Sequence, residues 1–255
     1  MTLHGFEVPG ADGRLIRGDR GDGTGRFVLC ITGFLSKRWG NKSKALAQWC
    51  AEQGWGFCCY DVRGSGDSDG AFTDYVLSDW MADARAVIAM LESEAKNKGR
   101  QLTLVGNSLG GWIAWLMAQE HEQVDRLVLI APAFNMMGVR AKSISPERRH
   151  HWHSTGWMPW DDDPIHRNWP LSWKWVEESE SYWRSTFDRL RRVKTTILHG
   201  SDDTVILPEG SREFVDLVRR RDPSYPVELH VIPGDHRLSA PAHMEQLHRV
   251  LLESA

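Results

Sequence analysis

The sequence has few cysteines, no excess of positive charge and no long apolar run, and each absence excludes a class of protein. Only four of the 255 residues are cysteine, and no Cys-x-x-Cys pair of the zinc-binding kind occurs. Lysine and arginine total 31 against 34 acidic residues, and this net charge of −3 argues against a nucleic-acid partner. No stretch approaches the roughly eighteen consecutive apolar residues that predict a membrane span. The opening MTLHGFEVPG lacks the basic start and apolar run of a secretory signal. We therefore expect a cytoplasmic protein with reduced, structural cysteines.

Short apolar runs alternate with longer amphipathic stretches along most of the chain. The predicted strands fall within residues 26–34, 55–61, 101–108, 126–133, 195–201 and 227–234. Several are apolar at nearly every position, which is typical of strands buried on both faces of a parallel sheet. The stretches between them have helical patterns, which implies right-handed crossovers. The opening HGFEVPGADGRLIRGD predicts a hairpin that adds an antiparallel edge. The sequence thus predicts one α/β domain over residues 1–255, with a mostly parallel central sheet flanked by helices.

Residues 135–190 break this alternation and contain seven of the thirteen tryptophans. The segment contains no convincing strand and directly follows the fourth predicted central strand. An insertion at this point lies over the edge where open α/β sheets bind ligands, so we expect a small tryptophan-rich cap. Trp169, Trp173 and Trp183 have spacings that could form one stripe on a helix. Trp157 and Trp160 flank Met158-Pro159 in an expected loop, and they are candidate substrate-binding residues at the entrance to the site.

VGNSLGGW, residues 105–112, ends an apolar strand and opens a helical pattern. Glycines stand two positions before and after Ser108, as a nucleophile elbow requires, because strand and helix pass too close there for a β-carbon. An ordinary glycine-rich turn or a phosphate cradle is the alternative. A P-loop needs Lys-Ser or Lys-Thr after its second glycine, whereas Gly-Trp stands here. The strand–turn–helix context favours Ser108 as a nucleophile.

A nucleophilic serine needs a base and an acid that orients the base. His236, in GDHRLS, follows the last predicted strand and comes last in the order Ser…Asp…His. The loop HGSDDTVILP offers both Asp202 and Asp203. The Gly-x-x-Asp spacing favours Asp203, and Asp202 is then a turn residue that bonds its own backbone. Asp235 adjoins the histidine and is expected to point away, and His199 is interpreted as a structural residue of its strand.

The remaining motifs concern the oxyanion hole, which stabilises the negative charge that forms on the substrate's carbonyl oxygen, and the binding of a dinucleotide or a metal. The backbone N–H groups of Leu109, after the nucleophile, and of Phe34, after ITG, are the expected oxyanion hole. The glycines of DVRGSGDSDG are spaced G-x-G-x-x-x-G, which does not fit the dinucleotide fingerprint, so we interpret this segment as a structural loop. The HHWH run at 150–153 lacks a helical i,i+4 histidine pair and is interpreted as a solvated face of the cap. No metal and no cofactor are expected.

Taken together, ITGF, DVRGSGDSDG, GNSLGG, HGSDDTVILP and GDHRLS resemble the α/β-hydrolase superfamily over nearly the whole chain. The segment at 31–70 and GDHRLS are similar to the ABHD10-like group of serine esterases, whose members act as acyl-protein thioesterases and as esterases of acyl glucuronides. The resemblance implies that Ser108 is the nucleophile, Asp203 the acid and His236 the base. It also implies that the backbone of Phe34 and Leu109 forms the oxyanion hole. The tryptophan-rich cap has no counterpart in this resemblance.

These observations predict a serine hydrolase that cleaves a small-molecule carboxylic ester or acyl thioester through an acyl-enzyme. A ligand-binding protein of the same fold without turnover is an alternative, because fold alone does not establish activity. A C–C or amide hydrolase with the same triad is another. A dehalogenase is disfavoured, because it would carry aspartate at position 108.

Overall fold

The computed structural model describes residues 1–93, 99–160, 169–188 and 190–253, with the side chain of Trp160 left out. A central sheet is built from β1 (Leu3–Pro9), β2 (Leu15–Gly21), β3 (Phe27–Ile31), β4 (Gly56–Tyr60), β5 (Leu102–Asn107), β6 (Val124–Ile130), β9 (Lys194–Gly200) and β10 (Val227–Ile232). Their order is β1-β2-β4-β3-β5-β6-β9-β10. The β1–β2 hairpin is antiparallel, β2 pairs antiparallel with β4, and the strands from β4 to β10 are parallel. The six predicted central strands and the hairpin are confirmed.

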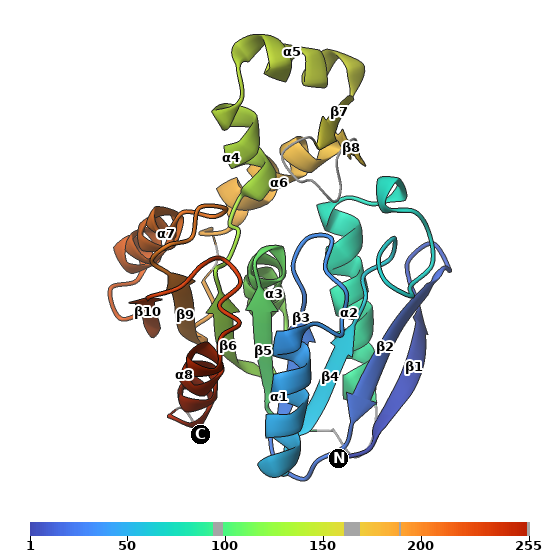
Figure 1. Ribbon diagram of the computed structural model, residues 1–255, viewed down its shortest axis with the longest axis vertical. Coiled ribbons are helices and arrows are strands. Elements are labelled where there is room, and N and C mark those ends of the chain that lie inside the picture. Colours follow the sequence, from blue (N-terminus) through green and yellow to red (C-terminus); the bar gives the residue numbers. More distant parts are fainter. Residues whose placement is uncertain (94–98, 161–168, 189, 254–255) are drawn as a thin grey trace.

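Helices cover both faces of this sheet (Figure 1). They are α1 (Asn41–Glu52), α2 (Leu77–Ser93), α3 (Leu109–Glu120), α4 (Met136–Ser143), α5 (Pro146–Thr155), α6 (Lys174–Ser185), α7 (Pro208–Arg221) and α8 (Pro241–Leu252), with a 3-10 turn η1 (Phe72–Asp74). Apolar residues of α1 and α8 pack on one face, and those of α2, α3 and α7 pack on the other. This is the predicted α/β architecture.

Strand β3 explains why the central strands read as continuous apolar runs. Val28 and Cys30 belong to the core beneath α1 and α8, whereas Leu29 and Ile31 belong to the core beneath α2 and α3. Successive side chains of a strand point to opposite faces, so a sheet covered on both sides buries every position. All five residues of β3 are buried accordingly.

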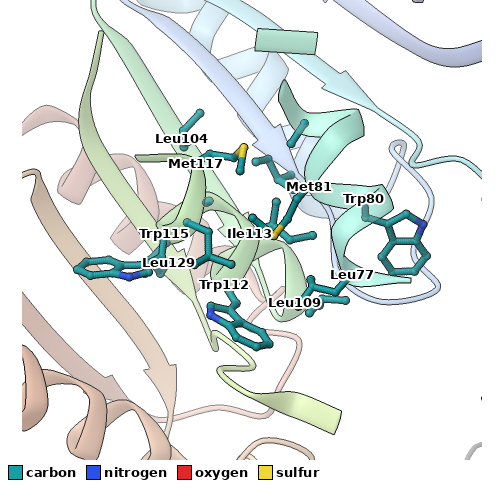
Figure 2. Close-up of a cluster of buried hydrophobic side chains, with 14 of the residues drawn as sticks. Leu77, Trp80, Met81, Leu104, Leu109, Trp112, Ile113, Trp115, Met117 and Leu129 are labelled. Atoms are coloured by element: carbon teal, nitrogen blue, oxygen red, sulfur yellow. The ribbon is translucent and has the colours of Figure 1, made fainter. Parts of the chain in front are cut away.

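Helix α3 is buried on all sides over most of its length. All residues from Leu109 to Ala118 are buried, as expected of a helix that is apolar on all sides. Figure 2 shows residues of this helix packed among side chains of α2 and of the sheet; those labelled are Leu77, Trp80, Met81, Leu104, Leu109, Trp112, Ile113, Trp115, Met117 and Leu129. The residue that precedes α3 is Ser108, so the candidate nucleophile stands on a rigid element.

Between β6 and β9 the chain forms α4, α5, the antiparallel pair β7 (Trp157–Trp160) and β8 (Trp169–Ser172), and α6. Figure 1 shows these elements beyond the carboxyl ends of the parallel strands. The expectation that this segment contains no strand is therefore wrong. Pro159 pairs with Pro170 across β7 and β8. Prolines argue against central strands but fit a two-stranded ribbon, in which both strands are edges.

The β7–β8 pair also corrects two expectations about the tryptophans. Trp157 and Trp160 lie in a strand rather than in a loop. Trp169 lies in β8, Trp173 immediately precedes α6, and Trp183 lies within α6, so the three do not form one helical stripe. Their spacing fits a helix, but the boundary between β8 and α6 falls between Trp169 and Trp183, so the three residues do not belong to one helix.

The four cysteines are free and buried. Burial raises the pKa of the Cys30, Cys50, Cys58 and Cys59 thiols, which keeps them protonated and unreactive. They pack as small apolar groups, as the sequence predicted. Among the helices of the described residues, none has the length and apolar character that a membrane crossing requires.

Candidate active site

Ser108 stands on a sharp turn between β5 and α3. Its backbone has φ 53° and ψ −122°, a conformation that side chains other than glycine's rarely adopt. Three hydrogen bonds hold it there. The Ser108 N–H donates to the Ile130 carbonyl at 2.8 Å, and its carbonyl accepts from the N–H groups of Gly111 at 2.9 Å and Ala133 at 3.0 Å. The strain is thus stored in a backbone that the surrounding elements determine.

The glycines of the elbow are required by close backbone approach. A β-carbon on Gly106 would lie 2.3 Å from the Gly110 carbonyl oxygen, and one on Gly110 would lie 2.3 Å from the carbonyl oxygens of Ile31 and Thr32. Both contacts are with backbone, which cannot move aside as a flexible side chain can. The pattern around Ser108 therefore reflects packing of α3 against β3 and β5.

The structure brings Ser108, His236 and Asp203 together in one hydrogen-bonded chain. The Ser108 Oγ lies 3.1 Å from His236 Nε2, and His236 Nδ1 lies 2.7 Å from Asp203 Oδ2. The three residues follow β5, β10 and β9, whose carboxyl ends share one edge of the sheet. Ser108 and Asp203 are 8% and 2% exposed, so both ends of this hydrogen-bonded series are largely shielded from water. An Nδ1–H that donates to the carboxylate leaves Nε2 free to accept the serine proton.

The carboxylate of Asp203 also accepts main-chain hydrogen bonds. Its Oδ1 accepts from the N–H groups of Val205 and Ile206, both at 2.9 Å, so the acid loop wraps around the carboxylate. Asp202 has a different role. Its Oδ2 accepts from the Gly234 N–H at 3.2 Å, which ties the acid loop to the histidine loop. The expectation that Asp202 bonds only its own turn is corrected, because its partner comes from the loop after β10.

The loop that carries His236 has further attachments. Asp235 points away from the imidazole, as expected, and its Oδ1 accepts from the N–H groups of Arg237 and Leu238. Lys42, from α1, donates to the Arg237 carbonyl, and burial lowers the pKa of this lysine. His243 Nε2 donates to the Pro233 carbonyl at 2.8 Å. These contacts limit how far the loop can shift relative to Ser108.

The candidate oxyanion loop follows β3 and lies against the elbow. A β-carbon on Gly33 would lie 3.1 Å from Ser108 Cβ, so Phe34 directly follows a point of contact with the nucleophile turn. Leu109 begins α3, where an N–H has no acceptor within the helix and the helix dipole favours negative charge. The two backbone N–H groups named from the sequence thus come from segments that meet beside Ser108.

Asp61, only 1% exposed, holds this loop from the neighbouring DVRGSGDSDG segment. Its Oδ1 accepts from the Arg38 N–H at 2.6 Å, its Oδ2 accepts from the Arg38 guanidinium, and Oδ2 also accepts from the Asp67 N–H at 3.0 Å. The Ser65 hydroxyl donates to the Ser36 carbonyl at 3.2 Å. The segment is a structural loop, as predicted, and the structure adds that it supports the loop bearing Phe34.

The side chain of Phe34 packs within an aromatic cluster from four elements. Its ring centroid lies 5.4 Å from that of Phe72 in η1 and 5.4 Å from that of Trp175 in α6, both edge to face. Trp80 of α2 lies 5.6 Å away, and Trp169 of β8 lies 5.4 Å from Phe72. Edge-to-face pairs are favourable beyond simple burial. The oxyanion loop and the segment above it are therefore packed as one unit.

The two candidate substrate-binding tryptophans, Trp157 and Trp160, both belong to β7. Trp157, in β7, is 44% exposed, and the side chain of Trp160 lies outside the described part of the structure. His150, His151 and His153 of α5 are exposed, as expected of a solvated face, whereas Trp152 of the same run is fully buried, so the expectation is wrong for that residue.

Residues 28–155 match the family model described as serine aminopeptidase, S33. The chain belongs to this α/β-hydrolase family. Bovine palmitoyl-protein thioesterase ABHD10, mitochondrial (Bos taurus), is 24% identical over 225 residues, which cover 86% of this chain and 70% of the relative. The solved alpha/beta hydrolase domain-containing protein 10 from mouse has a TM-score of 0.83 at 23% identity, with 99% and 98% of the two chains covered.

A putative hydrolase from Agrobacterium vitis S4 aligns over 99% of this chain and 98% of its own, with a TM-score of 0.82 and 24% identity. These matches confirm the resemblance to ABHD10-like α/β hydrolases and the fold. The solved structures support the fold described here.

Sequence reasoning missed residues that act through the backbone or at a distance in the chain. Lys42 and His243 carry no motif of their own, Asp61 was seen only as part of the DVRGSGDSDG loop, and the contacts of all three depend on which loops meet. His199 had a visible signal: a histidine inside an otherwise apolar strand, four residues before Asp203. A buried polar side chain requires partners, and that requirement could have drawn attention to it.

Proposed function

We propose that this α/β hydrolase cleaves a small-molecule carboxylic ester or acyl thioester through an acyl-enzyme intermediate, with Ser108, His236 and Asp203 as its catalytic triad. The observation that carries the proposal is the pair of hydrogen bonds from Ser108 through His236 to Asp203, at 3.1 Å and 2.7 Å. These distances lie within the reach that proton transfer between nucleophile and base needs.

Each group has a defined part in the reaction. The Ser108 Oγ attacks the acyl carbonyl carbon while its proton passes to His236 Nε2, and Asp203 stabilises the imidazolium that forms. The carbonyl oxygen gains negative charge and accepts hydrogen bonds from the N–H groups of Phe34, in the loop after β3, and of Leu109, at the start of α3. Collapse of the tetrahedral intermediate breaks the bond to the alcohol or thiol, which takes the proton from Nε2. Water then repeats the sequence and releases the carboxylic acid from Ser108.

The printed name of the bovine relative, palmitoyl-protein thioesterase, supports an acyl thioester as one substrate class. The family description, serine aminopeptidase, makes amide hydrolysis the second candidate. We also propose that Trp157 and Trp160 contribute to substrate binding at the entrance. The exposure of Trp157 on β7, in a segment that packs through Trp169 and Phe72 toward the oxyanion loop, favours this role.

The test has two parts. Wild-type protein should react with a fluorophosphonate probe, and S108A should not; undiminished labelling of S108A would remove Ser108 from the mechanism. A panel of p-nitrophenyl esters, acyl thioesters and aminoacyl p-nitroanilides of increasing acyl length then separates the substrate classes. Faster turnover of the anilides than of every ester and thioester would favour the amide candidate. Probe labelling without turnover of any member would favour a ligand-binding protein.

A further inference from the structure

A second histidine contacts the acid of the triad. His199 lies in β9, is fully buried, and shares with Ile197 the face of the sheet that α7 covers. Its Nδ1 lies 2.8 Å from the Ser211 Oγ of α7. Its Nε2 lies 2.8 Å from the Ile206 carbonyl oxygen and 3.2 Å from Asp203 Oδ2. The ring therefore connects α7, the acid loop and the carboxylate.

The contacts of His199 determine its tautomer. A carbonyl oxygen and an ionised carboxylate can only accept, so the proton must reside on Nε2. The Ser211 hydroxyl can donate to Nδ1, which completes the hydrogen bonds of a neutral ring. Burial lowers the pKa of His199 and so favours this neutral form. The single Nε2–H of the neutral ring is shared between the Ile206 carbonyl oxygen at 2.8 Å and Asp203 Oδ2 at 3.2 Å.

With His199 included, the carboxylate of Asp203 accepts four hydrogen bonds. Oδ1 accepts from the N–H groups of Val205 and Ile206, and Oδ2 accepts from His236 at 2.7 Å and from His199 at 3.2 Å. Rotation about the Cβ–Cγ bond of an aspartate is otherwise soft. Donors on both oxygens restrict that rotation.

We propose that His199 is a positioning residue for the triad: its Nε2–H orients the Asp203 carboxylate toward His236. The inference rests on the proposed function, in which Asp203 is the acid. Any buried histidine needs partners for both ring nitrogens. What distinguishes His199 is that one of its partners, Asp203 Oδ2, is the same oxygen that lies 2.7 Å from His236 Nδ1.

Asp202, Asp235 and Lys42 are the other charged groups of the loops around His199 and Asp203, and each forms hydrogen bonds with the main chain. Asp202 accepts from the Gly234 N–H, Asp235 accepts from two N–H groups of its own loop, and Lys42 donates to the Arg237 carbonyl. None of these contacts involves His199. A substitution at position 199 therefore changes the donors on Asp203 and leaves the surrounding charges in place.

The test compares H199F with H199Q, using H248F as a matched control. The Gln side chain can place an amide N–H where Nε2–H stands, whereas Phe keeps the ring and loses the donor. His248, in α8, is a partly buried histidine that stacks on Trp49 of α1. Michaelis kinetics with a p-nitrophenyl ester would be recorded over about pH 5 to 9.

We expect H199F to lower kcat by about ten- to a hundredfold with little change in KM, because the acid is misoriented while substrate binding is unaffected. The loss should be present across the measured pH range. H199Q should recover most of it, and H248F should match wild type. Unchanged kinetics in H199F, or equal defects in H199F and H199Q, would overturn the proposal.

A measurement on the wild-type protein keeps the proposal testable if H199F does not fold. Nitrogen-15 NMR of the imidazole side chains should find His199 neutral and protonated at Nε2 at neutral pH. An Nδ1–H tautomer or a charged ring would refute the role. Failure of the proposed function is distinguishable, because it would appear as turnover in S108A or as none in wild type, whatever the tautomer of His199.

Discussion

The sharpest prediction concerns Asp203, because its neighbours determine how an amide would sit in its place. In D203N the oxygen of the new amide must take the Oδ1 position, since two N–H groups, from Val205 and Ile206, point at it from 2.9 Å. The amide NH₂ then takes the position of Oδ2, the atom that lies 2.7 Å from His236 Nδ1 in the wild-type protein. The imidazole must accept there and carry its proton on Nε2, where it can no longer receive the proton of Ser108.

The magnitude follows from what the substitution removes. D203N loses a charge-assisted hydrogen bond to the imidazolium, which is worth about 1.5 to 3 kcal/mol. When His236 carries its proton on Nδ1, as the reaction requires, that N–H faces the NH₂ of the new amide, and the clash of two buried donors costs about 1 to 3 kcal/mol. Together these amount to about 3 to 6 kcal/mol of transition-state stabilisation, or about 10²- to 10⁴-fold in kcat. His199 Nε2–H also meets the NH₂, so the melting temperature should fall.

The assay is kcat and KM for a p-nitrophenyl ester, with D202N as the control. Asp202 accepts from the Gly234 N–H at 3.2 Å, and an Asn oxygen can do the same, so D202N should lose only a few-fold in kcat. Thermal melts of both variants separate lost activity from lost structure. A folded D203N with kcat within about tenfold of wild type, or a larger loss in D202N than in D203N, would refute the assignment of the acid.

Four further predictions follow from the same structure. D61N should lower both the melting temperature and kcat while KM stays nearly constant, because the buried carboxylate that binds Arg38 holds the oxyanion loop; equal kinetics would contradict this support role. W157A should change KM progressively along a series of acyl lengths, and parallel kinetics at every length would remove this tryptophan from the substrate path. Burial lowers the pKa of His248, so below about pH 6.5 the unfolded chain gains a proton there before the folded one does, and the melting temperature declines. H248F removes this group and should make that decline smaller. S108G should melt above S108A, because glycine relieves about 1 to 3 kcal/mol of strain at φ 53°; identical melts would argue against strain at the elbow.

Residue patterns predict the sheet and the three triad positions because these depend on local chemistry. The strands of a sheet covered on both faces must be apolar throughout, and the elbow needs glycines beside Ser108 wherever strand and helix nearly touch. Spacing alone also distinguished Asp203 from Asp202, and the structure brings Asp203, not Asp202, to the imidazole. The cytoplasmic location stays a prediction.

The rest of the site depends on contacts between distant segments, which no local pattern encodes. Nothing in DVRGSGDSDG reveals that Asp61 will meet Arg38, because the contact requires β3 and β4 to end side by side. The histidine in TTILHG was interpreted as structural, although its partners Asp203 and Ser211 identify it as part of the acid's surroundings. The β7–β8 pair was missed because Pro159 and Pro170 argue against strands unless each faces the other in an isolated ribbon.

The aromatic cluster around Phe34 links the segment above the sheet to the chemistry below it. Phe34 contributes its backbone N–H to the proposed oxyanion hole and its ring to a contact with Trp175 of α6. Helix α6 is also joined to α2, because Glu178 accepts from the Ser78 N–H at 2.7 Å and from its hydroxyl at 2.8 Å. A change in α6 that displaces Trp175 therefore acts on the Phe34 loop. Under the proposed mechanism, in which the Phe34 N–H stabilises the oxyanion, substitutions in α6 should lower kcat and not change substrate preference alone.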